Sequence, residues 1–597
     1  MRILLISSSY NGLCQRAHVE LEHLGHDISV SLALSADDVR KAVALFQPDV
    51  IICPFLKEKI PEDVWSRHLC IILHPGIKGD RGPSSLDWAI LNGEEEWGVT
   101  ALQAAEEMDA GDIWATATFK MRQASKASIY RREVTRAAIR AMLETVERIE
   151  SRTFAPEPLD YSKPDVRGEL RPLMKQQERV IDWEHDNVEN IIRKINAGDS
   201  APGVLDTIDG EEYFLYGAHE ERELQGWKPG EIIAQRHGAI CRAAIDGAVW
   251  VSHLRRKNVQ KTPFYKRFLS RAKQLDFKLP AAMLLGDTLS DVQESPIDLL
   301  YRGTEQTFRE IWYEEAHQVG YLHFDFHNGA MSTDQCRRLQ EAYLLAVKRP
   351  TRVLVLMGGT DFWSNGVHLN IIEASDNPAN ESWRNINAID DVVLGILTTE
   401  TKLTISAVWG GAGAGGAMML LAADKVWARE GVVLNPHYKT MGLYGSEYWT
   451  YSLPKRVGPV KALELTETPL PLGMKKAKAI GYIDEILPDD FFEFQAQLRQ
   501  KAEALASGSN YVHLLAEKRE RREKDERAKP LAAYRAAELQ HMKMNFAGKF
   551  YGGEVNYHEA RYNFVHKVRP KETAAYLAKH MRLDSDRFSE LRQPLAY

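Results

Sequence analysis

Two separate parts of this chain alternate short apolar runs with amphipathic stretches, and this pattern limits the fold more than any other feature. In the first 150 residues, buried strands are predicted at Arg2–Ser7, Asp27–Ala33, Val50–Cys53 and Leu69–Leu73. Helices are predicted between them, at Gln15–Leu24, Ala36–Phe46 and Leu86–Leu91. Such alternation predicts a parallel, doubly wound sheet. It returns from Asp298 to about Pro488, so the sequence predicts an α/β protein with two such domains.

The 597 residues exceed what a single hydrophobic core organises, since domains usually hold roughly 100–200 residues. A proline- and charge-rich stretch from Ala155 to Pro172 is predicted to be a linker or a wrapping segment. After it, one helix at Val188–Ile195 precedes short strands punctuated by glycine, which predicts a small, mostly β module. We therefore expect a first domain at 1–165, the β module at 166–260, a basic linker at 261–285, a second α/β domain at 286–505 and a helical C-terminal extension at 506–597.

Composition argues against several classes of protein. With 76 Lys and Arg against 83 Asp and Glu, the net charge of −7 gives no sign of nucleic-acid binding through phosphates. No apolar run approaches the roughly 20 residues that cross a bilayer, and the N-terminus resembles a buried strand more than a signal peptide. The five cysteines are scattered without a Cys-x-x-Cys pair, which argues against disulfides and a thiolate metal site. We expect a cytoplasmic protein that binds no metal, nucleic acid or membrane.

A first group of polar residues is predicted at the edge of the first sheet. His74 directly follows a buried strand, and ligands of open parallel sheets bind at that edge. Asp109 lies in a glycine turn between two predicted strands, and a carboxylate beside a histidine raises the basicity of the imidazole. Taken singly, both residue types are commonly structural in such places. Candidate ligand contacts at this edge are Gln15, Arg16, Arg81 and Arg131, with surface ion pairing as the alternative role of Arg131.

This combination resembles the folate-dependent formyltransferases. Their pattern is Asn-x-His, a loop ending in Arg-Gly-x-x-Pro, and Asp-x-Gly-Asp or Asp-Gly-Gly about 35 residues after the histidine; His74, Arg81-Gly82 and Asp109-x-Gly111-Asp112 match its order and spacing. The resemblance implies that 10-formyltetrahydrofolate donates the formyl group, and that His74 and Asp109 handle the tetrahedral intermediate and its protons. The β module is similar to the C-terminal, OB-like barrel of methionyl-tRNA formyltransferases, through Ile181-Asp-Trp183 and Pro202-Gly203.

One position departs from that pattern, because Ile72 stands where the family has its asparagine. The asparagine donates a hydrogen bond to the developing oxyanion, and the loss of such a donor typically costs about 2.7–4 kcal/mol. Either another donor replaces it, or the acceptor of the formyl group differs from an ordinary amine. A domain that only binds folate is the remaining alternative.

Glycines at 411, 413 and 416 satisfy the dinucleotide fingerprint, after a predicted strand at Thr404–Val408 and before a predicted helix at Ala417–Ala422. The acidic residue expected about 20 positions later is missing. The fingerprint normally opens its domain, whereas about 100 residues of strand and helix precede these glycines. We therefore expect no NAD.

The stretch from Val353 to Leu369, with Ser364-Asn-Gly-Val367 after a strand, resembles the crotonase (enoyl-CoA hydratase/isomerase) superfamily. The resemblance implies an acyl-CoA site in which the backbone N–H groups of Val367 and Gly415 hold a thioester oxygen. Hydratases carry two glutamates where this chain has Met418 and His437 (or Tyr438, with a shift of one residue), so hydration of a double bond would lack its acid/base pair. Candidates to move a proton at the acyl group are His437, Tyr438, Tyr444 and Glu447, with packing as the alternative role of each.

A formyltransferase half fused to a crotonase half resembles the HypX (HoxX) family of hydrogenase maturation proteins over essentially the whole chain. That family implies formyl transfer from 10-formyltetrahydrofolate to coenzyme A (CoA), followed by decarbonylation of formyl-CoA to CO and CoA. The CO then becomes a ligand of the iron in [NiFe]-hydrogenase. Partners would accordingly include the precursor of the hydrogenase large subunit or other maturation factors.

The stretch from Arg255 to Lys278 contains nine Lys or Arg and one Asp. It is either a solvated linker or a phosphate-binding face. In the second case, basic side chains pair with the CoA phosphates. The candidates are Arg255, Arg256 and Lys257.

Three other functions remain open from the sequence. One is a formyltransferase that uses another acceptor, joined to an independent acyl-CoA-processing crotonase domain. The second is a non-catalytic scaffold that binds a hydrogenase precursor. The third is a nicotinamide-dependent enzyme.

Overall fold

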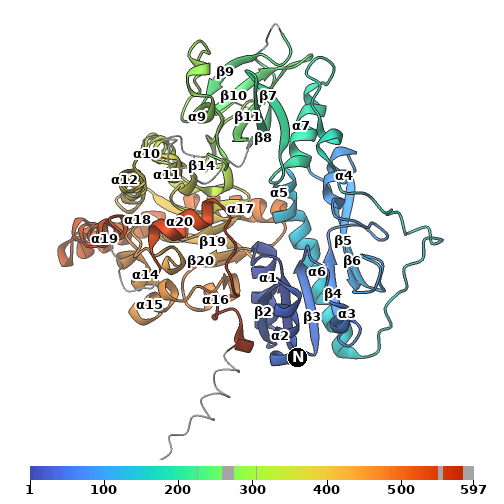
Figure 1. Ribbon diagram of the computed structural model, residues 1–597. Coiled ribbons are helices and arrows are strands. Elements are labelled where there is room, and N and C mark those ends of the chain that lie inside the picture. The colour runs from blue at the N-terminus through green and yellow to red at the C-terminus, as the bar shows by residue number, and fades with distance from the viewer. Residues whose placement is uncertain (225, 227, 258–274, 304–305, 549–554, 582–597) are drawn as a thin grey trace, which may run out of the picture. The chain divides into compact units, whose positions relative to one another are not determined.

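The computed structural model describes residues 1–224, 226, 228–257, 275–303, 306–548 and 555–581. The chain divides into two compact units (Figure 1). Unit 1 contains Met1–Asp182, Glu189–Asp206 and the residues from Arg569 onward, and unit 2 contains Trp183–Val188 and Thr207–Val568.

Unit 1 is built on a six-stranded sheet with the order β2-β1-β3-β4-β5-β6. Its strands are β1 (Arg2–Ser7), β2 (Asp27–Leu32), β3 (Val50–Phe55), β4 (Cys70–His74), β5 (Glu96–Gln103) and β6 (Ile113–Lys120). The first four strands are parallel, as predicted. β5 runs antiparallel to both β4 and β6, and the chain passes from β5 to β6 through a loop without an intervening helix.

Helices cover both faces of this sheet, which gives the doubly wound arrangement. They are α1 (Gly12–His23), α2 (Ala36–Phe46), α3 (Glu62–Trp65), α4 (Ser85–Leu91), α5 (Lys126–Ile129) and α6 (Thr135–Ser151); α7 (Val188–Gly198) starts in unit 2 and continues in unit 1. α2 and α3 bury their apolar side chains against one face, while α1 and α6 pack together (Figure 1). α1 begins three residues before its predicted start, because the Asn11 side chain accepts a hydrogen bond from the Cys14 N–H (3.0 Å) and caps the helix.

Residues near the C-terminal end of the described chain contact β2, the edge strand of the unit 1 sheet. The Val30 N–H donates to the Leu577 carbonyl at 3.0 Å. The Ser29 hydroxyl lies 2.8 Å from Nδ1 of His580. The predicted extension at 506–597 is thus divided between the two units.

The first part of unit 2 is the small β module. Its antiparallel strands have the order β8-β11-β10-β9, and β12 pairs with β11. They are β8 (Glu211–Glu221), β9 (Ile232–Arg236), β10 (Ala239–Ala243), β11 (Ala248–Arg256) and β12 (Leu279–Pro280), while β7 (Val204–Ile208) crosses the boundary between the units. The indole of Trp250 on β11 is fully buried, so the module has its own apolar centre.

The rest of unit 2 contains a six-stranded sheet and a four-stranded sheet. The larger has the order β13-β14-β15-β17-β19-β22, parallel except for the β13–β14 hairpin, and the smaller has the order β16-β18-β20-β21. The strands are β13 (Ile311–Ala316), β14 (Val319–Phe324), β15 (Val353–Leu356), β16 (Phe362–Ser364), β17 (Leu403–Val408), β18 (Gly411–Gly413), β19 (Lys425–Arg429), β20 (Val433–Asn435), β21 (Leu472–Gly473) and β22 (Glu485–Leu487). Separate apolar clusters cover the two faces of the larger sheet.

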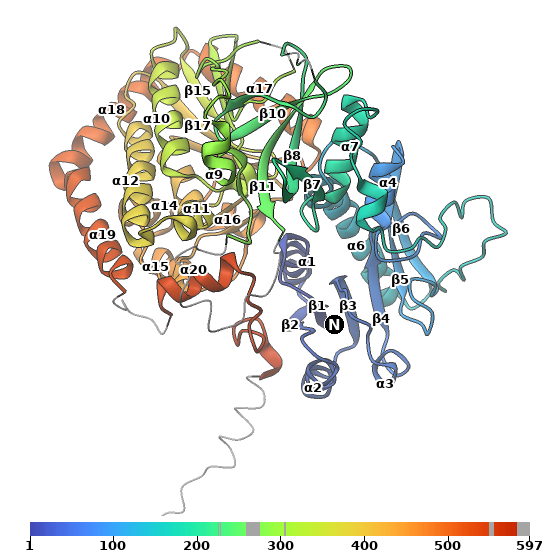
Figure 2. The ribbon, with the colours of Figure 1, turned by 45° about the horizontal axis from the view of Figure 1, so that its top comes forward.

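The helices of unit 2 surround these sheets (Figure 2). They are α9 (Ala281–Leu285), α10 (Thr333–Val347), α11 (Leu369–Ala374), α12 (Pro378–Leu397), α13 (Gly415–Met419), α14 (Trp449–Val457), α15 (Pro459–Glu467), α16 (Met474–Ala479), α17 (Phe491–Ser507), α18 (Tyr511–Ala528), α19 (Leu531–Phe546) and α20 (Tyr557–Val565). α19 packs against α12 and α14. The helix predicted at Ala417–Ala422 begins two residues earlier, at Gly415, and continues as a 3₁₀ turn over Leu420–Ala422.

Within the described ranges, no helix combines the length and the apolar character that a membrane crossing requires. The same residues contain no group of three or more His, Cys, Asp or Glu side chains that could hold a metal ion.

Candidate functional site

In unit 1, His74 is the last residue of β4 and lies opposite Thr100 of β5. The loop that follows it is fixed to β5 by two hydrogen bonds. The Trp97 indole N–H donates to the Pro75 carbonyl (3.0 Å), and the Thr100 hydroxyl donates to the Gly76 carbonyl (2.9 Å). The imidazole of His74 is therefore buried at the carboxyl end of its strand, where the sequence predicted a ligand edge.

The structure brings His74 and Asp109 together, as the sequence predicted. Nδ1 of His74 lies 3.6 Å from Oδ2 of Asp109. Asp109 occupies the β5–β6 turn with φ of +56°, and its carboxylate also accepts a hydrogen bond from the Gly82 N–H at 3.3 Å. The turn needs glycine at 111, since a Cβ there would lie 1.9 Å from the Gln103 carbonyl oxygen.

A second carboxylate, Asp80, contacts the other ring nitrogen of His74. Its Oδ2 lies 3.0 Å from Nε2, and both side chains are buried. Burial opposes the charged imidazole, but the hydrogen bond to Asp80 and the charges of Asp109 and Asp80 outweigh it and raise the pKa of His74. Sequence reasoning missed Asp80, whose only signal is an aspartate in the glycine-rich loop before Arg81.

Three of the candidate ligand residues of unit 1 lie on two helical elements. Gln15 is on α1, where its amide donates to the Tyr10 carbonyl (3.1 Å), and Arg16 on the same helix is buried with its Nε 3.8 Å from Glu20. Arg131 is half-buried in a π-helical turn, Tyr130–Val134, between α5 and α6.

Arg81 holds the β5–β6 turn in place. Its guanidinium pairs with Glu107 at 2.5 Å and donates to the Met108 carbonyl at 3.1 Å. Both partners immediately precede Asp109, so Arg81 fixes the β5–β6 turn whether or not it also contacts a ligand.

In unit 2, two loops meet where an oxyanion hole was predicted. Val367 follows Gly366, and a Cβ on Gly366 would lie 3.3 Å from the backbone nitrogen of Gly415. Gly415 is the first residue of α13, so its N–H has no partner inside the helix. Among the described residues, the N–H of Val367 has no hydrogen-bond partner either. Two neighbouring backbone donors are thus available to one oxygen atom, which fits a thioester carbonyl.

The Glu447 carboxyl lies directly beside this pair of donors. A Cβ on Gly415 would lie 2.0 Å from Oε1 of Glu447. The other oxygen, Oε2, accepts hydrogen bonds from the Tyr438 hydroxyl (2.8 Å) and the Ser446 N–H (3.0 Å). Burial and the neighbouring Asp390 raise the pKa of Glu447 to about 8. This carboxyl can therefore exchange a proton near neutral pH.

Two further buried carboxyls hold the backbone around Glu447, and sequence reasoning missed both. Glu447 and Tyr448 have φ of +60° and +57°, a conformation that side chains rarely adopt. Asp390 of α12 accepts from the Glu447 N–H (2.9 Å), and Glu538 of α19 accepts from the Tyr448 N–H (3.0 Å). Burial raises the pKa of Asp390 to about 6 and that of Glu538 to about 8. Two helices distant in sequence thus hold the strained backbone, and a sequence pattern carries no signal of that.

The other two predicted polar residues have different surroundings. His437 follows β20, and burial lowers the pKa of its imidazole to about 4. The ring of Tyr444 packs 4.3 Å from the ring of His541 on α19. Glu447 therefore lies beside Gly415 and is hydrogen-bonded to Tyr438, whereas Tyr444 packs against α19.

The predicted CoA-phosphate residues lie at the end of β11. The Arg255 guanidinium lies over the Phe214 ring at 4.3 Å, and that of Arg256 lies over the Tyr213 ring at 5.8 Å. Lys257 pairs with Glu212 at 2.8 Å. The rest of the basic stretch, residues 258–274, lies outside the described residues.

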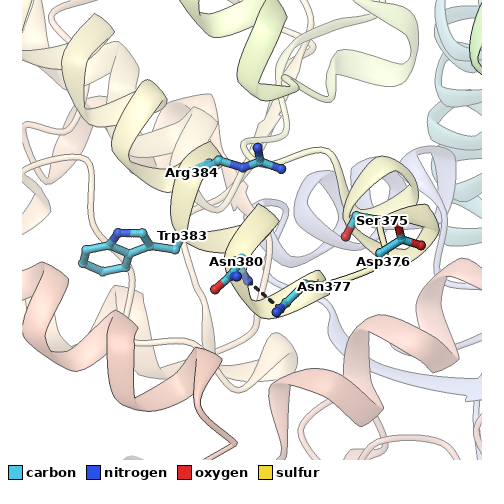
Figure 3. Close-up of a pocket in the computed structure, with 6 residues that line it drawn as sticks. All are labelled: Ser375, Asp376, Asn377, Asn380, Trp383 and Arg384. Atoms are coloured by element: carbon cyan, nitrogen blue, oxygen red, sulfur yellow. Dashed lines mark hydrogen bonds between the residues drawn. The ribbon is translucent and has the colours of Figure 1, made fainter.

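A separate surface pocket of about 600 Å³ lies at the start of α12 (Figure 3). It is lined by Ser375, Asp376, Asn377, Asn380, Trp383 and Arg384. The Asn377 side chain caps α12 there by accepting from the Asn380 N–H (3.0 Å). None of the candidate catalytic residues lines this pocket.

Comparisons with known proteins match both halves of the chain. Three family models match: formyl transferase at residues 19–146, formyl transferase C-terminal domain at 173–269, and enoyl-CoA hydratase/isomerase at 326–570. The hydrogenase maturation factor HoxX of Bradyrhizobium diazoefficiens is 46% identical over 581 residues, 97% of each chain. A methionyl-tRNA formyltransferase of Geobacter metallireducens is 25% identical over 37% of this chain and 69% of its own.

Among solved structures, HypX from Aquifex aeolicus in complex with tetrahydrofolic acid matches with a TM-score of 0.90 and 44% identity, over 100% of both chains. These matches confirm the predicted formyltransferase and crotonase resemblances and their fusion.

Proposed function

Because this chain belongs to the HoxX family of hydrogenase maturation factors, we propose that it makes carbon monoxide for a [NiFe]-hydrogenase in two steps. Unit 1 transfers the formyl group of 10-formyltetrahydrofolate to the thiol of CoA, and unit 2 decarbonylates formyl-CoA to CO and CoA. The observation that carries this proposal is the buried Glu447 carboxyl directly against Gly415, the first residue of α13. The recipient of the CO is the precursor of the hydrogenase large subunit.

In the first step His74 and Asp109 move protons. Asp109 accepts the proton of the thiol as the sulfur attacks the formyl carbon and the C–S bond forms. His74, whose pKa is raised, holds a proton beside the developing oxyanion and donates it to N10 of the folate as the C–N bond breaks. Asp109 then passes the proton taken from the thiol to His74, so His74 is restored and the net result is the transfer of one proton from the thiol to N10. A thiol acceptor also fits the loss of the asparagine donor at Ile72.

In the second step the N–H groups of Val367 and Gly415 hold the thioester oxygen. The Glu447 carboxylate takes the formyl hydrogen as a proton, while the Tyr438 hydroxyl donates to that carboxylate. The C–S bond breaks, its electron pair stays on sulfur, and the proton passes from Glu447 to the sulfur. CO leaves without any change of oxidation state that would need a further reactant.

The decisive experiment traps CO from the purified protein with a reduced haem protein that reports it spectroscopically. CO that requires both 10-formyltetrahydrofolate and CoA supports the two-step reaction. Loss of the formyl group without CoA, and without CO, would contradict it and favour a formyltransferase with another acceptor.

The pH dependence of the second step follows from Glu447. A pKa of about 8 means that this carboxyl is mostly protonated at pH 6 and ionised at pH 9. Since the ionised form is the base, we expect the rate of CO release from formyl-CoA to rise about tenfold or more from pH 6 to pH 9. Initial rates with supplied formyl-CoA measure this, and a rate that falls over this range would contradict the role of Glu447 as base.

The contact between Gly415 and Glu447 gives a second prediction. In Gly415→Ala the new Cβ would lie 2.0 Å from Oε1 of Glu447 and must displace the carboxyl. Because a shift of about 1 Å at a reacting group can cost about 10²-fold, we expect CO release from formyl-CoA to fall at least that far. Gly411→Ala is the matched control, since its Cβ would meet its nearest atom only at 3.5 Å. Equal rates in both variants, with unfolding temperatures like that of the wild type, would contradict the prediction.

A further inference from the structure

The loop after β4 folds back so that the Asp80 carboxylate reaches the histidine six residues before it. Asp80 Oδ2 lies 3.0 Å from Nε2 of His74, and Asp109 Oδ2 lies 3.6 Å from Nδ1. The Asp80 side chain is 0% exposed, whereas that of Asp109 is 11% exposed. The two carboxylates thus differ in their access to a ligand, although both face the same ring. Among the described residues, they are the charged groups that face this imidazole.

We propose that Asp80 is a positioning residue for formyl transfer, which fixes the His74 ring through Nε2 and balances its positive charge, while the more accessible Asp109 exchanges protons. This inference rests on the proposed function of unit 1. A buried carboxylate that accepts from one ring nitrogen sets the tautomer and the orientation of an imidazole, as in serine protease triads. The protonated ring then supplies positive charge to the oxyanion, where Ile72 offers no donor.

The loop is shaped to hold Asp80 in this place. A Cβ on Gly76 would lie 2.4 Å from Oδ2 of Asp80 and 2.5 Å from Nε2 of His74, so only glycine leaves room for their hydrogen bond. The Asp80 N–H donates to the Ile77 carbonyl (2.9 Å), which closes the turn. Any residue larger than glycine at position 76 would therefore separate the Asp80 carboxylate from the His74 ring.

The segment before the β module holds this loop from outside. The Gly168 N–H donates to the Lys78 carbonyl (2.9 Å), and the Arg81 N–H donates to the Glu169 carbonyl (3.1 Å). A Cβ on Gly168 would lie 1.8 Å from the Asp80 nitrogen, so the two backbones are in direct contact. The stretch that the sequence left as a linker or a wrapping segment therefore wraps the loop and fixes the backbone of Asp80.

The test compares Asp80→Asn with the conservative Asp80→Glu and with Asp160→Asn, which removes an exposed carboxylate whose hydrogen bonds are to Ser162. The rate of formyl transfer to CoA is measured against pH for each full-length protein. In Asp80→Asn we expect kcat to fall about 10²-fold, and the loss of activity at high pH to begin at lower pH, because His74 loses its proton more easily. Asp80→Glu should recover part of both, and Asp160→Asn should match the wild type.

A titration of the ¹⁵N-labelled histidines by NMR gives a readout that does not depend on activity. The His74 signals are assigned by their absence in His74→Gln. We expect the pKa of His74 to be lower in Asp80→Asn than in the wild type. An unchanged pKa and an unchanged pH profile would overturn the role of Asp80. A wild type that titrates as expected but transfers no formyl group would instead overturn the proposed function.

Discussion

Replacing His74 by alanine is expected to abolish CO formation from 10-formyltetrahydrofolate and CoA, while CO release from supplied formyl-CoA continues. His74 is buried between two carboxylates and is the proposed proton donor of the first step. General acid–base groups contribute about 10²–10⁴-fold to the rate, so we expect a loss of that size. The measurement is CO by haem spectroscopy with each substrate in turn.

The matched control for this variant is His23→Ala, which removes an exposed histidine at the end of α1. It should leave both activities within about twofold of the wild type. If His74→Ala made CO from 10-formyltetrahydrofolate and CoA at the wild-type rate, the formyltransferase half would bind folate or a partner without performing the formyl transfer. Equal loss of CO from supplied formyl-CoA would indicate damage beyond the first site.

Replacing Glu447 by glutamine should give the opposite pattern. Tetrahydrofolate would still form from 10-formyltetrahydrofolate and CoA, but CO release from formyl-CoA should fall by about 10²–10⁴-fold. Glutamine keeps the shape of the side chain and removes the carboxylate that we propose as the base beside Gly415. The formyl thioester should accumulate or hydrolyse to formate, and both are measured beside CO.

Glu493→Gln is the control, because it makes the same chemical change at an exposed residue in the first turn of α17. A Glu447→Gln protein that releases CO within twofold of the wild type would remove Glu447 from the mechanism. The base would then be sought among the other residues at the oxyanion hole.

The proposed function predicts that His74→Ala loses only formyl transfer and that Glu447→Gln loses only CO release from formyl-CoA. This pair of results distinguishes it from a non-catalytic scaffold. If the protein is a scaffold, the wild type and both variants should show neither formyl transfer nor CO release. If the protein is a formyltransferase with another acceptor, His74→Ala should be the only one of the two substitutions that lowers formyl transfer, and the transfer should not require CoA.

The sequence by itself determined the two α/β domains, the β module between them, and the motifs around His74, Asp109, Val367 and Gly415. These follow from local patterns, because apolar periodicity sets strands and helices, and glycine spacing sets the turns that leave N–H groups open. Residues within one loop or one strand end reach one another over short lengths of chain, so their spacing carries the information. The pairing of His74 with Asp109 is of this kind, since His74 ends β4, β5 is the neighbouring strand, and Asp109 lies in the turn that follows β5.

Only the tertiary structure decided which buried carboxyls support those motifs. Asp80 reaches His74 because the loop folds back beneath a segment about 90 residues later, and Asp390 and Glu538 reach Glu447 and Tyr448 from two separate helices. The pKa shifts of Asp390 and Glu538 depend on burial and on neighbouring charges, which exist only once distant parts of the chain are packed together. An aspartate or glutamate has the same local sequence pattern whether its side chain faces solvent or supports a buried loop, so the pattern could not identify these three carboxyls.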